Sequence, residues 1–262
     1  MNNIGINGFG RIGRSILRII VESNSDLNVI AINDLGDKET LSYLFKHDSI
    51  MGILNMNVEL EDDSLIVGDR KIKLISHSDP REIPWSDLGV DLVVESTGFF
   101  RDKDSLDKHI SSGAKKVVLT VPPKDEIDAT IVLGVNDNSL NPDDKLISNA
   151  SCTTNCLAPI AKVLNDNFKI KSGLMTTVHA YTNDQNLIDN YHPSDRRGRS
   201  AALNLVITDT GAAKAVSEVL PELKGKLTAN AIRVPTPNVS LAILNLTLKR
   251  GVGVDEINDC FR

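Results

Sequence analysis

Cysteine is scarce in this sequence, since the 262 residues include only three. Two of them, Cys152 and Cys156, lie four residues apart in the stretch SNASCTTNC, and Cys260 is remote from both. On a helix, residues at that spacing have Cβ atoms about 5–6 Å apart, which is wider than disulfide geometry prefers. No pair of histidines lies nearby at the spacing of metal ligands, so a zinc site is excluded as well. The pair therefore either packs on a helix face or contains a reactive thiol.

Long apolar runs and an excess of basic residues are also lacking. No segment approaches the length of a membrane-spanning helix, and the start MNNIGINGFGRIGRS has no basic region followed by an apolar one, as a signal peptide would. Lys and Arg total 29 against 35 Asp and Glu, for a net charge of -6. This balance argues against broad electrostatic binding to nucleic acid or anionic lipid, although local anion pockets remain open. We expect a cytoplasmic, reducing location.

The sequence does contain alternating strand and helix signals. A short strand ends near Asn7, a glycine-rich turn and a helical stretch follow, and a second apolar run covers Val29 to Ile32. This order of elements is typical of an α/β fold with a parallel sheet. The apolar residues that recur at helical spacing are Ile12, Ile16, Ile19 and Ile20.

The glycine-rich turn matches the dinucleotide pattern G-x-G-x-x-G at Gly8, Gly10 and Gly13. It follows a strand, opens a helix, and has an acidic residue, Asp34, about 20 positions further on. Without side chains, the backbone can approach a pyrophosphate, and the free N–H groups of the helix start can bind it. A carboxylate at Asp34 suits an adenosine ribose and repels a 2′-phosphate, which favours NAD over NADP. The alternative is a tight structural turn with Asp34 capping a loop.

Further strand signals follow, and their carboxyl ends carry polar or small residues. In an open parallel sheet, ligands bind beyond these ends, so Ser96, Thr97, Gly98 and Thr120 are candidate cofactor neighbours, although each also suits an ordinary turn. Gly68-Asp69 indicates a hairpin between the adjacent strands. The predicted strands are Leu65–Val67, Lys71–Ile75, Asp91–Thr97, Val117–Val121, Thr130–Gly134 and Leu146–Ser148.

The residues from Cys152 onward predict a helix with Ser151 as its N-cap and an apolar stripe that begins at Leu157. Cys152 would then lie in the first turn, where the helix dipole favours a thiolate, and Cys156 would lie deeper, toward the stripe. A predicted strand over Gly173–Asp184 carries His179 near its end. If the two side chains meet, they form an activated Cys–His pair. Otherwise both cysteines only pack.

Several features favour binding of phosphate groups. A predicted helix starts at Thr210-Gly211, three arginines lie in SDRRGRS, and Arg233 lies where a strand breaks near Pro235. Taken singly, each basic residue is more often a solvated surface charge. Together with Thr182 they predict two phosphate sites near one thiol.

The motifs, taken in order, closely resemble those of phosphorylating glyceraldehyde-3-phosphate dehydrogenases, and the resemblance covers essentially the whole chain. The blocks that carry it are INGFGRIGR, AIND, ESTGFF, SNASCTTNC, TTVHAYTNDQ, TGAAKAV and RVPTPNVS. The resemblance implies a Rossmann-type doubly wound parallel sheet in an NAD-binding domain over residues 1–151. It also implies an α+β catalytic domain over 152–262, and a homotetramer. Members of the family continue beyond Arg262, so we expect a C-terminally incomplete chain.

The same resemblance implies roles for individual residues. Cys152 is expected to be the nucleophile and His179 its base. The implied NAD-binding residues are Gly8, Gly10, Arg11, Ile12, Gly13, Asp34, Thr97, Gly98 and Thr120. The implied contacts to inorganic phosphate and to the substrate phosphate are Ser151, Thr153, Thr210 and Gly211, and Thr182, Arg197 and Arg233, respectively.

The implied reaction is the NAD-dependent conversion of glyceraldehyde 3-phosphate and inorganic phosphate to 1,3-bisphosphoglycerate through a thioester on Cys152. Two alternatives remain at this point. Ile188–Pro193, IDNYHP, resembles the corresponding loop of erythrose-4-phosphate dehydrogenases, whereas Thr182 and the TGAAKAV helix favour the triose enzyme. The second alternative is a non-catalytic NAD-binding fragment.

Overall fold

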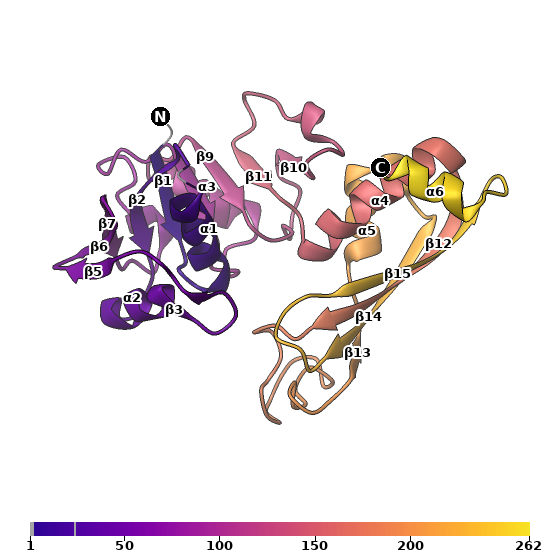
Figure 1. The fold of residues 1–262 in the computed structure, drawn as a ribbon. Coiled ribbons are helices and arrows are strands. Elements are labelled where there is room, and N and C mark those ends of the chain that lie inside the picture. Colours follow the sequence, from indigo (N-terminus) through magenta and orange to yellow (C-terminus); the bar gives the residue numbers. More distant parts are fainter. Residues whose placement is uncertain (1–2, 24) are drawn as a thin grey trace. The chain divides into compact units, whose positions relative to one another are not determined.

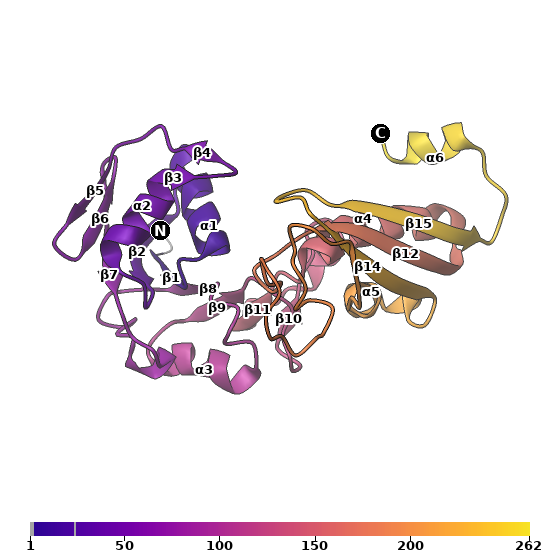
Figure 2. The ribbon, with the colours of Figure 1, turned by 90° about the horizontal axis from the view of Figure 1, so that it is seen from below.

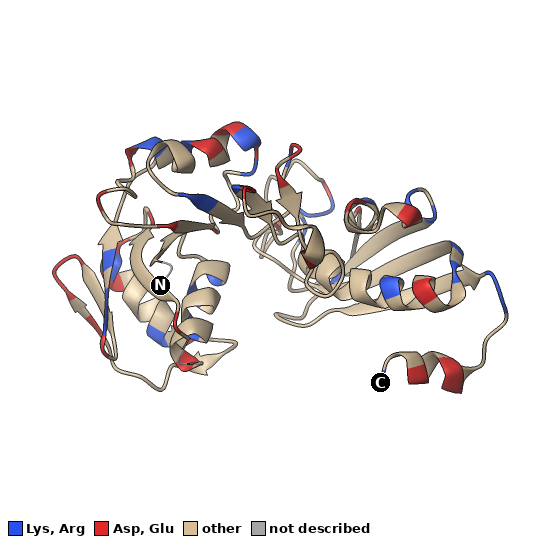
Figure 3. Cartoon of the chain, turned by 90° about the horizontal axis from the view of Figure 1, so that it is seen from above, with Lys and Arg blue, Asp and Glu red and all other residues tan. Residues whose placement is uncertain are grey.

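The computed structural model describes residues 3–23 and 25–262, which form two compact units (Figures 1 and 2). The first unit runs to Thr130 and resumes over Leu140–Ala150, while the second consists of Ile131–Ser139 and Ser151–Arg262. Lys, Arg, Asp and Glu occur in both units (Figure 3). Within the described residues, no helix is both long and apolar enough to cross a membrane.

The first unit is built on one sheet whose centre is parallel. Strand β1 pairs in parallel with β2 on one side and with β8 on the other. The chain order of the strands therefore reverses at β1, and ligands of such sheets bind outside the carboxyl ends at this point. In spatial order the strands are β10 (Ala129–Thr130), β11 (Leu146–Ser148), β9 (Lys116–Leu119), β8 (Leu92–Glu95), β1 (Asn3–Asn7), β2 (Asn28–Asn33), β7 (Arg70–Ile75), β6 (Ser64–Val67) and β5 (Val58–Glu61).

Helices cover both faces of this sheet, which confirms the predicted doubly wound architecture. One buried cluster joins Ile6 and Ile32 to Leu17 of the first helix, and another joins Val117 to Trp85 and to Leu106 of the third. Burial of these side chains is the main force that holds the layers together. The remaining elements of this unit are α1 (Arg11–Glu22), α2 (Lys38–Lys46), α3 (Lys103–Ser111), the short pair β3 (His47–Asp48) and β4 (Gly52–Ile53), and the 3-10 turn Pro80–Glu82.

The turn between β6 and β7 agrees with the sequence prediction, whereas the strand predicted from Thr130 does not. The β6–β7 hairpin turns at Gly68, whose φ of 61° lies in the left-handed region, as predicted. The predicted strand Thr130–Gly134 is wrong beyond Thr130, because the N–H of Val132 donates to the Asn136 side chain and Gly134 turns with φ 75°.

The buried face of α1 differs from the predicted stripe. Ile20 is buried, but Ile12 and Ile19 are 45% and 58% exposed. The helix instead buries Gly13, Leu17 and Val21, because Gly13 faces the glycine turn that precedes the helix. The close packing of Gly13 on the glycine turn therefore decides which face of α1 is buried, and the spacing of the isoleucines does not.

The second unit is an α+β domain in which β12 lies between a parallel and an antiparallel neighbour. Strand β12 pairs in parallel with β14 and antiparallel with β15, and α4 and α5 pack against each other and against this sheet (Figures 1 and 2). The elements are α4 (Cys152–Phe168), β12 (Ile170–Ala180), β13 (Val206–Thr208), α5 (Ala212–Val219), β14 (Leu227–Val234), β15 (Leu241–Leu248), α6 (Val254–Cys260), and the 3-10 turns Asp137–Ser139 and Pro221–Leu223.

Candidate active site

Helix α4 begins at Cys152, as the sequence predicted. Ser151 is its N-cap, and the Ser151 hydroxyl accepts a hydrogen bond from the backbone N–H of Thr154 at 3.1 Å. The cap leaves other N–H groups of the first turn without helical partners. Cys152 therefore lies at the positive end of the helix dipole, where a negative charge on sulfur is stabilised.

The structure brings Cys152 and His179 together. His179 lies near the end of β12, and its Nε2 is 3.5 Å from the Cys152 Sγ atom. The cysteine side chain is exposed, whereas the histidine is only 9% exposed. A thiol open to a reactant and backed by an imidazole is the arrangement that nucleophilic catalysis requires.

The backbone fixes which nitrogen of His179 faces the thiol as an acceptor. The Nδ1 atom lies 2.7 Å from the carbonyl oxygen of Ala180, and a nitrogen and a carbonyl can be this close only if the nitrogen carries hydrogen. The neutral ring therefore presents the lone pair of Nε2 to the Cys152 thiol, and the proton that Nε2 takes from the thiol is the hydrogen that it then donates to the thiolate. Arg233 Nη1 lies 3.2 Å from Nδ1, but it donates to the same Ala180 carbonyl at 3.1 Å.

The hydrogen bond with His179 is the largest influence on the Cys152 thiol. It lowers the pKa of Cys152 from its ordinary value of 9.0 to about 7, although partial desolvation of the sulfur, in a side chain that stays open to solvent, opposes the shift. A large fraction of the thiol is then ionised near neutral pH. The pKa therefore matches the requirements of a nucleophile that works at physiological pH.

Three of the predicted substrate-phosphate residues lie in one region of the second unit. Arg233 Nη1 donates to the Thr182 hydroxyl at 3.2 Å, and Arg197 Nε donates to the Thr208 hydroxyl at 3.0 Å. Burial lowers the pKa of Arg233, and the charge of Arg197 lowers it further, so the two guanidinium groups repel each other. A phosphate dianion bound between them would relieve that repulsion. Asp184, which pairs with Arg197, was not anticipated from the sequence.

The predicted inorganic-phosphate residues lie at the starts of two helices that pack together. Ser151 and Thr153 belong to the first turn of α4, and the Thr153 hydroxyl lies 3.9 Å from the Cys152 sulfur. Thr210 and Gly211 precede α5, and the N-cap residue Gly211 makes no side-chain hydrogen bond to the helix start. The Thr210 hydroxyl accepts a hydrogen bond from the Ala212 N–H at 3.2 Å. Free N–H groups at helix starts bind anions.

The glycine turn of the first unit fits a dinucleotide. Gly8 has a φ of 89°, and a Cβ on it would lie 2.6 Å from the Thr97 nitrogen; a Cβ on Gly13 would lie 2.2 Å from the Gly8 carbonyl oxygen. A Cβ on Gly10 would meet nothing within 4 Å, and Gly10 caps α1 without a side-chain bond. Two glycines therefore allow close packing, and the third leaves an open approach to the helix N-terminus, as the pyrophosphate of NAD requires.

Two other residues predicted to bind the cofactor, Asp34 and Arg11, have identifiable partners. The Asp34 carboxylate accepts from the N–H groups of Phe9 at 2.6 Å and Gly36 at 2.8 Å. A carboxylate has about four acceptor positions, so capacity remains for ribose hydroxyls. Arg11 pairs with Asp48 at 2.6 Å, a contact that the sequence did not indicate.

Thr97, Gly98 and Thr120 lie at the carboxyl ends of β8 and β9, as predicted. Gly98 has a φ of 72°, and Thr120 bonds through its N–H and its hydroxyl to the Glu95 carbonyl, both at 3.1 Å. Thr97 donates its N–H to the Glu95 carboxylate at 2.8 Å. These ends form one edge of the first unit together with the glycine turn.

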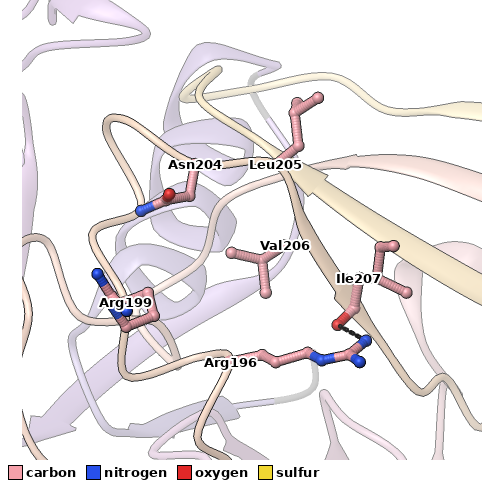
Figure 4. A pocket seen from close by; sticks show the side chains of 6 residues that line it. All are labelled: Arg196, Arg199, Asn204, Leu205, Val206 and Ile207. Atoms are coloured by element: carbon pink, nitrogen blue, oxygen red, sulfur yellow. Dashed lines mark hydrogen bonds between the residues drawn. The ribbon is translucent and has the colours of Figure 1, made fainter.

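One prediction about the thiols is wrong. Cys156 is exposed rather than packed, because the buried face of α4 is formed by Leu157, Ala161 and Leu164, and Cys156 lies beside that face. A separate open pocket is lined by Arg196, Arg199 and residues 204–207 (Figure 4). It contains none of the predicted site residues.

Two family models match the chain. The NAD binding domain of glyceraldehyde 3-phosphate dehydrogenase matches residues 2–103, and the C-terminal domain of the same enzyme matches residues 151–262. Glyceraldehyde-3-phosphate dehydrogenase 1 of Bacillus cereus is 52% identical over 263 residues, which cover 100% of this chain and 78% of the relative. The glyceraldehyde-3-phosphate dehydrogenase of Borreliella burgdorferi is 54% identical over 265 residues, covering 99% and 78% of the two chains.

Proposed function

The chain belongs to the glyceraldehyde-3-phosphate dehydrogenase family, and we propose that its Cys152–His179 pair carries out the family's chemistry. The activity is the NAD-dependent oxidation of glyceraldehyde 3-phosphate in glycolysis, with inorganic phosphate as the second substrate. The observation that supports our assignment of the catalytic residues is the 3.5 Å distance between Cys152 Sγ and His179 Nε2.

The reaction follows from the atoms that these residues present. The Cys152 thiol gives its proton to His179 Nε2, and the thiolate attacks the aldehyde carbon. The new oxyanion accepts hydrogen bonds from the Cys152 N–H and from the protonated Nε2. His179 Nε2 passes its proton to the oxyanion to form a hydroxyl, and the neutral Nε2 then takes the hydroxyl proton back as the carbon is oxidised. Bound NAD supplies the hydride acceptor. The product on Cys152 is a thioester, which inorganic phosphate attacks to give 1,3-bisphosphoglycerate and to release the thiolate.

Two sets of residues would hold the two phosphate groups. Thr182, Arg197 and Arg233 are assigned to the phosphate of the substrate, since two repelling guanidinium groups lie there beside a hydroxyl. The starts of α4 and α5 are assigned to inorganic phosphate, through Ser151, Thr153, Thr210 and Gly211. This leaves the thioester on Cys152 close to the anion that attacks it.

The first unit provides the cofactor site in this proposal. Residues 1–151 are assigned as the NAD-binding domain and residues 152–262 as the catalytic domain. Asp34, with acceptor capacity for ribose hydroxyls, favours NAD over NADP. The residues assigned to NAD are Gly8, Gly10, Arg11, Ile12, Gly13, Asp34, Thr97, Gly98 and Thr120.

The proposed experiment measures NADH formation from glyceraldehyde 3-phosphate, NAD and phosphate. Cys152→Ser should lower kcat by at least about 10³-fold, because the thioester can no longer form. Cys156→Ser is the matched control, since it removes an exposed thiol one helical turn away, and it should retain activity. Equal losses in both variants, or none in Cys152→Ser, would refute the assignment of Cys152.

Substrate choice is tested in the same assay. Erythrose-4-phosphate dehydrogenase is not favoured, because the family models and the relatives are glyceraldehyde-3-phosphate dehydrogenases. We expect a higher kcat/KM for glyceraldehyde 3-phosphate than for erythrose 4-phosphate, and a strict need for phosphate. Turnover that is indifferent to phosphate would contradict the role given to the two helix starts.

We further propose that the protein is a cytoplasmic homotetramer. Large apolar side chains on the second unit support assembly, because Leu203 is 84%, Tyr191 87% and Leu241 60% exposed in the single chain. The molar mass from light scattering at several concentrations tests the assembly. A mass that stays near the 28.5 kDa of one chain would contradict it.

A further inference from the structure

A buried carboxylate lies directly behind the cofactor edge and has no role in the reaction described above. Glu95 is the last residue of β8 and is 0% exposed. Its Oε2 atom receives the Asn7 side-chain amide at 2.5 Å and His109 Nε2 at 3.1 Å. Its Oε1 atom receives the Thr97 N–H at 2.8 Å and also the Thr97 hydroxyl.

The tautomer of His109 is fixed by a group that can only donate. The indole Nε1–H of Trp85 points at His109 Nδ1 at 3.0 Å, and both residues are fully buried. Since an indole N–H has no acceptor capacity, Nδ1 must offer its lone pair, and the ring hydrogen is on Nε2. His109 therefore donates to Glu95. A hydrogen on His109 Nδ1 would point at the Trp85 indole N–H, and neither group could accept it.

The orientation of Asn7 is fixed in the same way from the other side. The backbone N–H of His77 donates to Asn33 Oδ1 at 2.8 Å, which places the amide nitrogen of Asn33 toward Asn7 Oδ1, also at 2.8 Å. The amide nitrogen of Asn7 then points to Glu95. Both ends of the network begin with a donor. The hydrogen bonds that link Asn33 to Asn7, and Asn7 and His109 to Glu95, therefore all point toward the carboxylate.

Four donor groups surround the two carboxyl oxygens of Glu95, an arrangement that suits the acceptor capacity of a carboxylate. Donors at these distances stabilise a buried negative charge. The network therefore has a single stable arrangement, and it joins the carboxyl ends of β1, β2 and β8, where the order of strands reverses.

This arrangement holds the glycine turn through Thr97 and Ser96. Glu95 binds both donors of Thr97, and the Thr97 backbone is the surface against which Gly8 packs, at a distance that excludes a Cβ. The neighbouring Ser96 hydroxyl donates to the Gly8 carbonyl at 2.6 Å. A shift of Thr97 would thus be transmitted directly to the turn that approaches the dinucleotide.

We propose that Glu95 is a positioning residue for NAD: oriented by the Trp85–His109 pair and by Asn7, its carboxylate holds Thr97 and the glycine turn in the geometry that the pyrophosphate requires. The inference rests on the proposed function, because it assumes that NAD binds at this edge. It assigns no chemical step to Glu95, whose side chain is fully buried.

The test compares Glu95→Gln with the wild-type chain in isothermal titration calorimetry with NAD. In Glu95→Gln, an NH2 group replaces one carboxyl oxygen, and its hydrogens then point at the two groups that donate to that oxygen. Thr97 or Asn7 must therefore move. We expect the dissociation constant for NAD to rise by about tenfold or more. The rate of Cys152 alkylation by iodoacetamide without NAD should stay unchanged, because that thiol belongs to the other unit. In turnover, KM for NAD should rise while KM for glyceraldehyde 3-phosphate does not.

Two further variants keep the result interpretable. Trp85→Phe retains most of the buried ring but removes the donor that sets the tautomer of His109, and it should weaken NAD binding in the same direction if Glu95→Gln fails to fold. Leu65→Ala removes a buried side chain of β6 outside the network and serves as the control for general destabilisation. It should lower the unfolding temperature without changing the affinity for NAD.

The outcomes separate the inference from the function on which it rests. Wild-type affinity in both network variants would overturn the role of Glu95, and so would a loss in Leu65→Ala equal to that in the network variants. A wild-type chain that binds no NAD would instead overturn the proposed function.

Discussion

At the scale of single residues, the reactivity of Cys152 depends on one neighbour. The hydrogen bond with His179 lowers the pKa of the thiol to about 7, so the thiolate predominates above that pH and is lost as the pH falls through it. We predict that the rate of iodoacetamide labelling at Cys152, followed by mass spectrometry, has its midpoint near pH 7. His179→Asn should move that midpoint up toward the ordinary value of 9.0. A midpoint that His179→Asn leaves in place would show that the helix dipole alone activates the thiol.

A second prediction at this scale concerns Arg233. In the described part of the chain, its buried Nε atom has no hydrogen-bond partner, while Nη1 binds Thr182 and Ala180. Arg233→Lys keeps the charge but removes the planar fork, so KM for glyceraldehyde 3-phosphate should rise by about tenfold or more. The comparison substrate is glyceraldehyde without phosphate. If its kcat/KM falls as far, Arg233 acts through His179 rather than on the substrate phosphate.

Residue-scale geometry was only partly predictable from the sequence. The motifs place a thiol at a helix start and a histidine at a strand end, but they say nothing about backbone carbonyls. The Ala180 carbonyl fixes the tautomer of His179, and any residue type at position 180 would supply such an oxygen. The pairing of Arg11 with Asp48 depends on a loop that bends back 37 residues later, which local patterns do not encode.

At the scale of elements, the three glycines before and within α1 have different roles. Gly10→Ala introduces a methyl group into open space, so we predict little change in the unfolding temperature but weaker binding of NAD. Gly13→Ala brings a methyl group within 2.2 Å of the Gly8 carbonyl oxygen, so it should lower both stability and binding. Calorimetric unfolding and NAD titration of the two variants provide the measurement. Equal unfolding temperatures for both variants would contradict this division of roles.

The sequence predicted most elements and erred where tertiary contacts decide. Strands β1, β2, β11 and β12 follow from short apolar stretches in the sequence. The rotation of α1 does not follow from its isoleucines, because Gly13 must face the glycine turn. The exposed position of Cys156 has a similar origin, since the buried face of α4 is centred on Leu157 and Ala161. Apolar spacing predicts that a helix has a buried face, but packing partners decide which one.

At the scale of the whole molecule, the proposed ligand sites divide between the two units. The proposed NAD residues belong to the first unit and those for phosphate and aldehyde to the second. In hydrogen–deuterium exchange, NAD should protect backbone amides near residues 8–13 and 96–98, and inorganic phosphate those near 152–154 and 210–212. Protection by NAD confined to 152–262 would contradict the assignment.

The overall architecture could be anticipated because the strand–helix alternation and the glycine fingerprint act together. A strand, a glycine turn, a helix and an acidic residue at the next strand end are consistent with a parallel doubly wound sheet and with little else. The antiparallel edge of β5 and β6 could not be placed, since a hairpin signal fixes the turn but not the side on which it joins the sheet. The segment 131–139 likewise belongs to the second unit because of its tertiary contacts, which local sequence patterns do not show.

That segment has a consequence for dividing the protein into fragments. The chain enters the second unit at Ile131, returns to the first for Leu140–Ala150, and leaves it again at Ser151. A protease that cuts once within 131–139 therefore leaves β11 on the C-terminal fragment, although β11 lies between β9 and β10 of the N-terminal fragment's sheet. The C-terminal fragment then carries a strand of the first unit's sheet, and the N-terminal fragment carries the residues from 131 to the cut, which belong to the second unit. Each fragment should therefore fold fully only when the other is present.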